Sequence, residues 1–367
     1  MTAEPTQDWL AGTEFAVQPA EHGDPVTRHG DPPAEAAALD FGTTEARSLR
    51  IQDARLIASR QTAAYTVLPG HERQLRFLRS NGIAWTSCED AIVVVGSSAP
   101  EVAATFDVPL VDVLPNGELP ESDPVGRQIV SLLVESILPP GGGVCAIALP
   151  GDPVEDTTTT AFIGNVVALR GYRPLLARGA SAAGLSVLTD FGLTGIMVDA
   201  GATGVSVAAV HRGREINAIT LPGGAASVTR RLAESDRRVF FDREGNQYFD
   251  LLACERWLQS PMRNLLSPAT REEARLTLDI TKMAAAIADA VSRLADRYPT
   301  ADARPAVALI GGLCRLHGFA SLIADEMAKR GVVANPMIVD ESEDGLTVAR
   351  GLLAVAEVER PRAASAA

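Results

Sequence analysis

The chain has 367 residues, a length typical of two or three domains, and 46% of them are hydrophobic, which is enough for substantial cores. Its 33 lysines and arginines are outnumbered by 46 aspartates and glutamates. The resulting net charge of −13 argues against non-specific binding of nucleic acid, whose phosphates need a surplus of cations. The sequence shows neither a signal peptide nor an apolar run of about 20 residues, so no transmembrane segment is expected.

The four cysteines are scattered singly along the chain and form no CxxC pair, so a zinc site is not expected. A reducing cytoplasm is the simplest environment for such thiols, and we expect the protein to be cytoplasmic. The four positions are Cys88, Cys145, Cys254 and Cys314.

Residues 1–36 are predicted to form a disordered tail, because they are rich in proline and acidic residues and poor in apolar ones. Four apolar residues depart from this composition, and an alternative is that they form a short docking motif. They are Trp9, Leu10, Phe15 and Val17.

From residue 37 onward, short apolar runs alternate with glycine turns and helical patterns. In residues 37–185 we expect strands at 38–51 (with a turn at Gly42), 54–67, 91–96, 144–149 and 174–177, and helices at 124–138, 157–170 and 181–188. In residues 186–358 we expect strands at 195–198, 205–210, 215–221 and 305–310, and helices from Gly223–Gly224 to Leu232 and at 280–298, 319–329 and 346–358. This repeated order predicts an α/β fold of two lobes, each with a mixed sheet. The second lobe is expected to carry an inserted subdomain at about 226–304, and residues 359–367 to form a tail.

Three short segments with glycines follow or end predicted strands, namely Leu39–Thr44, Val198–Gly204 and Ala308–Gly312. Each glycine permits a tight turn in which backbone N–H groups face a phosphate. In the first two segments an aspartate, Asp40 or Asp199, ends the strand and is suited to hold a hydrated magnesium ion. Two such units, about 160 residues apart, predict a duplicated fold that grips one nucleotide between its halves.

This order of motifs resembles the superfamily of actin, heat-shock chaperone and sugar-kinase ATPases, and within it the bacterial actins of the MreB type. The resemblance spans roughly residues 38–358. The matching segments are Asp40–Thr43, Val95–Gly96, Pro115–Leu119, Ala148–Pro150, Ser181–Gly184, Asp199–Gly201, Leu221–Gly224, Ile310–Gly312 (with Gly318 beyond) and Val348–Gly351.

The resemblance implies ATP and Mg²⁺ as ligands. Gly42 and Thr43 would approach the β- and γ-phosphates, and Asp40 and Asp199 would orient magnesium through water. The segment around Gly201 would form a second phosphate hairpin, and the adenosine would lie against two glycines of the third segment. The full set of expected ligand-binding residues is Asp40, Gly42, Thr43, Thr44, Asp199, Gly201, Ala202, Thr203, Gly223, Gly224, Gly311, Gly312 and Leu313.

Several positions depart from the family's pattern. Arg178 stands where relatives have the glutamate that positions the attacking water, and a guanidinium cannot accept a proton from water. Thr203 replaces the last glycine of the Asp-x-Gly-x-Gly hairpin, which suggests a reshaped loop or an alignment shifted by one residue. Ala225 follows the paired glycines in place of an aspartate. Trp257 is interpreted as a core or interface residue, with stacking on a base as the alternative.

The resemblance implies an MreB-like bacterial actin homologue that binds ATP with magnesium and acts in filament formation or cell morphogenesis. The departures predict that its hydrolysis is slow or absent. The alternative is a non-polymerising adaptor, similar to FtsA or PilM, that links the tail of a membrane protein to a cytoplasmic assembly. A chaperone and a sugar kinase are less favoured, because neither a substrate-binding segment nor a catalytic aspartate for a sugar hydroxyl is identified. Self-association into filaments or dimers is expected, and any contact with the membrane would run through a partner protein.

Overall fold

The structure is a computed structural model of the chain and describes residues 16–18, 36–52, 55–88, 90–120, 124–151, 157–241, 245–260, 263–298, 305–332, 336–339 and 345–360. Most of the predicted N-terminal tail, including Trp9, Leu10 and Phe15, lies outside these residues, as does the end of the chain from residue 361. Four residues of the predicted tail lie in strands instead: Ala16–Gln18 form β1, and Ala36 begins β2.

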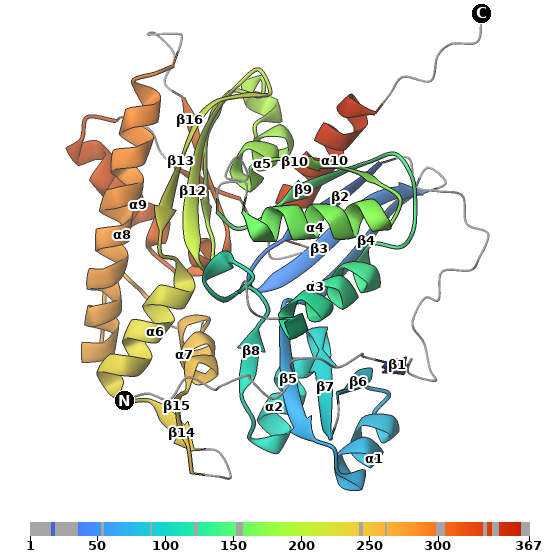
Figure 1. The fold of residues 1–367 in the computed structure, drawn as a ribbon. Coiled ribbons are helices and arrows are strands. Elements are labelled where there is room, and N and C mark those ends of the chain that lie inside the picture. The colour runs from blue at the N-terminus through green and yellow to red at the C-terminus, as the bar shows by residue number, and fades with distance from the viewer. Residues whose placement is uncertain are drawn as a thin grey trace, which may run out of the picture.

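The first large sheet has the strand order β10–β9–β2–β3–β4 (Figure 1). The three strands β10, β9 and β2 are parallel, and β3 and β4 continue the sheet in antiparallel fashion. Two helices, α3 and α4, cover one face through a core that includes Leu39, Ile147 and Ile163. The elements are β2 Ala36–Phe41, β3 Glu45–Gln52, β4 Arg55–Thr62, α3 Pro124–Ile137, β9 Val144–Ala148, α4 Thr158–Leu169 and β10 Arg173–Leu176.

A smaller, antiparallel sheet follows β4, with the order β1–β6–β7–β5–β8. The predicted single strand 54–67 is therefore wrong: the chain breaks at Ala63, and β5 leaves the first sheet to pair with β7 and β8. Two helices that the periodicity did not predict, α1 and α2, pack on this sheet around Leu78 and Val102. The elements are β5 Ala64–Pro69, α1 Glu72–Ser80, β6 Trp85–Cys88, β7 Ala91–Val95, η2 Gly96–Ser98, α2 Ala99–Phe106, β8 Leu110–Asp112 and η3 Pro115–Gly117.

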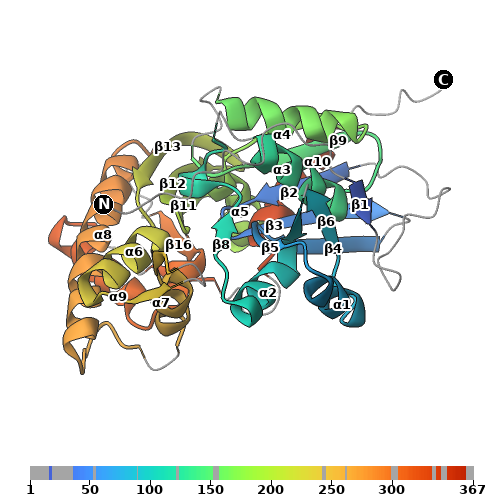
Figure 2. The ribbon, with the colours of Figure 1, turned by 60° about the horizontal axis from the view of Figure 1, so that its bottom comes forward.

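The second large sheet has the order β13–β12–β11–β16–β17 and is covered on one face by α8 and α9 (Figures 1 and 2). The helices α6 and α7 and the hairpin β14–β15 stand at its end (Figure 1). The elements are η4 Thr189–Phe191, β11 Gly195–Ala200, β12 Gly204–His211, β13 Arg214–Pro222, α6 Ala225–Asp236, β14 Val239–Phe241, β15 Gln247–Phe249, α7 Leu251–Leu258, α8 Arg271–Ala295, β16 Ala306–Ile310, η5 Gly312–Arg315, α9 Phe319–Lys329 and β17 Met337–Ile338.

Two helices, α5 (Gly179–Val187) and α10 (Thr347–Glu359), lie between the two large sheets. Side chains alternate between the two faces of a strand. On β2 and β11, the face that does not pack on the outer helices contributes Ala38 and Met197 to one core, which these strands share with α5 and α10. The helix α5 packs on β11 and β12, whereas α10 packs on β2 and β9. Each helix therefore packs on the sheet of the other half of the chain, and the two together join the halves.

The helices α5 and α10 touch backbone to backbone at Gly351. A Cβ atom at this position would overlap the carbonyl group of Ala182. The small residues of segments 181–184 and 348–351 therefore allow the two helices to pack closely. This role was not predicted from the sequence.

The long helix α8 begins at Arg271, nine residues before the predicted start at Ile280. A capping box fixes this start, since the N–H of Glu273 donates to Oγ1 of Thr270 at 3.1 Å. The carboxylate of Glu273 accepts hydrogen bonds from the N–H of Ala269 at 2.7 Å and from Nη1 of Arg263 at 2.6 Å. The Ala269 N–H, followed by Arg263, lowers the pKa of Glu273.

Because the pKa of Glu273 is lowered in the folded state, the free energy of unfolding of the second half should fall when the pH becomes acidic. A group whose pKa is lower in the folded state stabilises that state above its unfolded pKa, and the contribution is lost as the pH falls through the folded value. We therefore expect Glu273→Gln to lower the melting temperature at pH 7, and the difference from the wild type to narrow below about pH 4. Calorimetry between pH 3 and 7 measures this, with Glu234→Gln on the exposed face of α6 as the control of equal charge. A difference that stays constant with pH would contradict the expectation.

All four cysteines are free thiols and are buried. Burial raises the pKa of Cys145 far above its ordinary range and raises that of Cys254 as well.

Candidate functional site

The first glycine turn joins β2 to β3 and presents two backbone donors. The N–H of Gly42 donates to the carbonyl of Glu45 at 3.0 Å and closes the turn. The N–H groups of Thr43 and Thr44 find no acceptor within the described part of the chain. Such a turn is suited to an anion, because adjacent N–H groups point at one place.

The second turn joins β11 to β12, and the start of α6 braces it. The N–H of Gly201 donates to Gly204 at 3.0 Å, while Ala225 and Ala226 donate to the carbonyls of Gly201 and Ala202 at 3.1 and 2.8 Å. A Cβ on Gly224 would lie 2.5 Å from the carbonyl oxygen of Ala202, so only glycine allows α6 to approach the hairpin this closely.

The replacement of glycine by Thr203 does not strain the hairpin. Neither Thr203 nor its neighbours Gly201 and Gly204 have a positive φ, so the turn needs no left-handed residue there. The N–H groups of Ala202 and Thr203 have no acceptor among the described residues, as in the first turn. The expectation of a reshaped loop is therefore not needed to accommodate this threonine.

The hydroxyl of Thr203 reaches a turn from the first half of the chain. A Cβ on Gly117, which has φ +90°, would lie 3.3 Å from Oγ1 of Thr203 and 3.0 Å from Cβ of Pro150. Gly117 and Pro150 belong to two of the segments that carried the resemblance, but they were not among the expected ligand-binding residues. They bring the first half of the chain against the second phosphate hairpin.

The third turn follows β16, which lies parallel to β11 with Ile310 opposite Asp199. Gly311 has φ +97°, and a Cβ there would lie 2.5 Å from the carbonyl oxygen of Ala200 and 2.8 Å from Oδ1 of Asp199. A Cβ on Gly312 would meet no atom within 4 Å. The structure thus joins the second and third expected segments at the carboxyl ends of adjacent parallel strands, a usual place for ligand sites in α/β sheets.

The two expected magnesium ligands occupy different surroundings. Nη1 of Arg47 donates to Oδ2 of Asp40 at 3.4 Å, and Nη2 of the same residue contacts Glu45 at 2.5 Å. Oδ2 of Asp199 lies 3.6 Å from the place of a Cβ on Gly179, at the start of α5. Within the described residues, no three His, Cys, Asp or Glu side chains are grouped as ligands of one metal ion.

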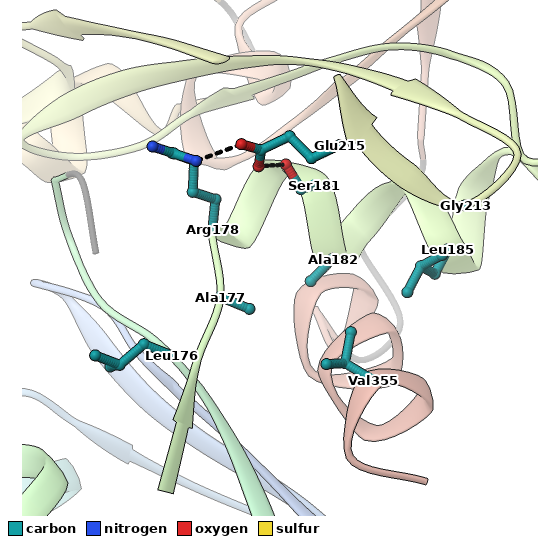
Figure 3. A pocket seen from close by; sticks show the side chains of 9 residues that line it. All are labelled: Leu176, Ala177, Arg178, Ser181, Ala182, Leu185, Gly213, Glu215 and Val355. Atoms are coloured by element: carbon teal, nitrogen blue, oxygen red, sulfur yellow. Dashed lines mark hydrogen bonds and ion pairs between the residues drawn. The ribbon is translucent and has the colours of Figure 1, made fainter. Parts of the chain in front are cut away.

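Arg178 stands immediately before α5, at the N-cap position, with its guanidinium in an ion pair with Glu215 of β13 (Figure 3). Ser181, on the first turn of α5, donates a hydrogen bond to the same carboxylate (Figure 3). The carboxylate of this group therefore comes from β13, and it is already engaged by Arg178 and Ser181. Sequence reasoning missed Glu215, because 37 residues separate it from Arg178.

Trp257 in α7 is part of the packing of the second half. The guanidinium groups of Arg263 and Arg238 lie 4.2 and 5.4 Å from its ring centre. The ring also packs against the core of the second large sheet. These contacts agree with the interpretation of Trp257 as a core residue, and the two arginines occupy the surroundings that a stacked base would need.

Two mixed sheets joined by α5 and α10, with glycine turns at the ends of their central strands, define an actin-like ATPase fold. The model of the family described as Volactin matches residues 36–356, and the chain belongs to this family. No curated protein matches the sequence. The described residues contain no helix with the length and apolar character needed to cross a membrane.

Solved structures confirm the expected fold class. The MamK double helical filament has a TM-score of 0.65 at 16% identity, with 88% of this chain and 99% of that chain covered. MreB5 of Spiroplasma citri bound to ADP has a TM-score of 0.59 at 12% identity, covering 86% and 94%. A non-polymerising mutant of MamK bound to AMPPNP has a TM-score of 0.53 at 15% identity, covering 89% and 100%. At these identities the likeness concerns the fold alone.

Proposed function

We propose that this protein is an actin homologue that binds ATP between its halves, hydrolyses it slowly or not at all, and assembles into filaments in the cytoplasm. The observation that carries the proposal is the set of backbone N–H groups without acceptors at the first two turns, on Thr43, Thr44, Ala202 and Thr203. Four such donors at two glycine turns fit the oxygens of a polyphosphate. The MamK and MreB5 structures, described as a filament or as bound to ADP or AMPPNP, support it by analogy.

The residues present fit a nucleotide better than they fit a metal held by protein ligands. The adenosine would lie over Gly311 and Gly312, where Gly312 leaves open space. Magnesium would stabilise the phosphate charge, and it would be held by phosphate oxygens and water, with Asp199 and Asp40 as outer ligands. Arg47 already pairs with Asp40, so we expect a metal ion to compete with this arginine for the Asp40 carboxylate.

Slow hydrolysis follows from the start of α5. Arg178 holds a permanent charge and cannot orient water as a proton acceptor, and its partner Glu215 is occupied by Arg178 and Ser181. Loss of a water-positioning group typically costs on the order of 10²–10⁴ in rate. The same observation favours a second candidate function, a non-polymerising adaptor that binds the tail of a membrane-associated protein, since an adaptor needs nucleotide binding without turnover.

Titration with a fluorescent ATP analogue, with and without magnesium, tests nucleotide binding. We expect saturation in the micromolar range and turnover far below that of an ordinary bacterial actin. Light scattering and sedimentation with ATP then separate the two functions, since filaments support the first and a stable monomer or dimer supports the adaptor. The absence of a saturable signal at high micromolar nucleotide would refute both.

A further inference from the structure

A cation is built into the first large sheet beside the first glycine turn. Asp40 of β2 and Arg47 of β3 stand directly opposite each other in the register of the two antiparallel strands. The side chains of such a pair start about 5 Å apart and point to the same face of the sheet. The register therefore brings Arg47 to the carboxylate that was expected to orient magnesium, and the sheet fixes this arrangement.

Further contacts hold the guanidinium of Arg47 in place. Its Nη2 and Nε atoms lie 2.5 and 3.2 Å from Oε2 of Glu45, while Nη1 lies 3.4 Å from Oδ2 of Asp40. A Cβ on Gly345 would lie 3.5 Å from Nη2, so the backbone just before α10 also packs against this group. The positive charge is therefore held at one place by residues of β2, β3 and the start of α10.

This charge lies close to the turn and faces the middle of the molecule. Leu49, two residues further along β3 and on the same face as Arg47, belongs to the core shared with α5 and α10. The pair of Asp40 and Arg47 stands two residues from the pair Gly42–Glu45 that closes the turn, a distance of about 7 Å, which a long arginine side chain can span. The side chains of Arg47 and Asp40 are 23% and 15% exposed, so a ligand can still reach them.

A polyphosphate at this turn needs a full positive charge in addition to the backbone N–H groups. The guanidinium of arginine is planar, permanently charged and matched to phosphate oxygens. The attraction between two charges is also stronger when they are largely withdrawn from water, as Arg47 is. A metal ion that approaches Asp40 is repelled by Arg47 and must displace it from the carboxylate, so the pair fits a metal ion poorly.

We propose that Arg47 takes the place of a metal ion at Asp40 and supplies the positive charge that the nucleotide needs at the first turn, so that the chain binds ATP with little dependence on magnesium. The inference rests on the proposed function, because it concerns the same nucleotide in the same site. It departs from the expectation, drawn from the sequence, that Asp40 orients magnesium through water.

Titration of the full chain with the fluorescent ATP analogue, once in EDTA and once in an excess of magnesium, tests the assignment. The readout is the ratio of the two dissociation constants, because a merely structural defect weakens binding in both media alike. We expect a ratio below about threefold for the wild type. For Arg47→Gln we expect binding in EDTA to be weaker by about thirtyfold and to be largely restored by magnesium.

Two further variants separate the role of this residue from a change in net charge. Arg60 is exposed and is the partner of Arg47 on the next strand, β4, so Arg60→Gln makes the same charge change one strand further from Asp40 and should behave like the wild type. Arg47→Lys keeps the charge but loses the fork that contacts two carboxylates, so it should lose less affinity in EDTA than Arg47→Gln does. Equal ratios for the wild type and Arg47→Gln would overturn the proposal.

A measurement without nucleotide tests the competition between Arg47 and the metal directly. Arg47→Gln leaves the carboxylates of Asp40 and Glu45 without the cation between them, so magnesium alone should raise the melting temperature of this variant and not that of the wild type. If magnesium stabilises both chains equally, Arg47 does not compete with the metal and the inference is overturned. If the wild type binds the ATP analogue only with magnesium, Arg47 does not replace the metal, while nucleotide binding stands. If the wild type binds it in neither medium, the proposed function fails together with this inference.

Discussion

Alanine at position 351 should lower the free energy of unfolding by about 3 kcal/mol or more. The methyl group would overlap the carbonyl of Ala182, so α10 and α5 must separate, and both helices are fixed to the sheets on either side. Because alanine is the better helix former, propensity alone predicts the opposite sign. Urea denaturation of the wild type and of Gly351→Ala measures the difference.

Gly164 is the matched control for this substitution. It also lies inside a helix, α4, but a Cβ at this position would meet no atom within 4 Å. Gly164→Ala should therefore stabilise the protein by about 0.5–1 kcal/mol. If both variants are stabilised, the close crossing of α5 and α10 does not hold the halves together as described.

Leucine at position 312 should abolish most nucleotide binding while leaving the fold intact. The side chain would extend from the third turn into the open space over which the adenosine is proposed to lie, because a Cβ there meets no neighbour. We expect the affinity for the fluorescent ATP analogue to fall at least tenfold, equivalent to about 1.4 kcal/mol. The melting temperature without nucleotide should match that of the wild type.

The neighbouring glycine supplies the contrast. Gly311→Ala should lower both the affinity and the melting temperature, since its φ is +97° and its Cβ would crowd Ala200 and Asp199. Normal nucleotide affinity in Gly312→Leu would contradict the placement of adenosine at the third turn, even if the phosphates bind as proposed.

The sequence predicted the central strands well, because their apolar runs are long and end at glycines. The runs before Gly42, Gly201 and Gly311 correspond to β2, β11 and β16. The sequence did not predict elements whose hydrophobic pattern is short. The helix α1 buries only Gln74 and Leu78, and two residues are too few to show a helical periodicity of apolar side chains. The start of α8 at Arg271 is encoded by Thr270 and Glu273, a capping box that lies outside the apolar stripe of the helix.

In the candidate site, too, some features could be predicted from the sequence and others could not. Segments whose role depends on local backbone, such as Gly42–Thr44 and Gly201–Thr203, could be predicted from glycine positions. Partners supplied by distant strands could not be predicted. Arg47 lies beside Asp40 because of the register between β2 and β3. Glu215 lies beside Arg178 because β13 continues the sheet on which α5 packs. Side-chain pairs of this kind decide the charge of the site and follow only from the fold.

The burial of all four thiols has a practical consequence for studying the protein. A reagent such as a maleimide reacts with an accessible thiolate, and Cys88, Cys145, Cys254 and Cys314 lie in the cores, where burial raises the pKa of two of them. Thiol-reactive labels should therefore react little with the folded natural chain, because all four of its thiols are buried. A single cysteine introduced on that surface can carry a fluorophore or spin label without removal of the native ones, and pairs of labels on the two halves can report the angle between them.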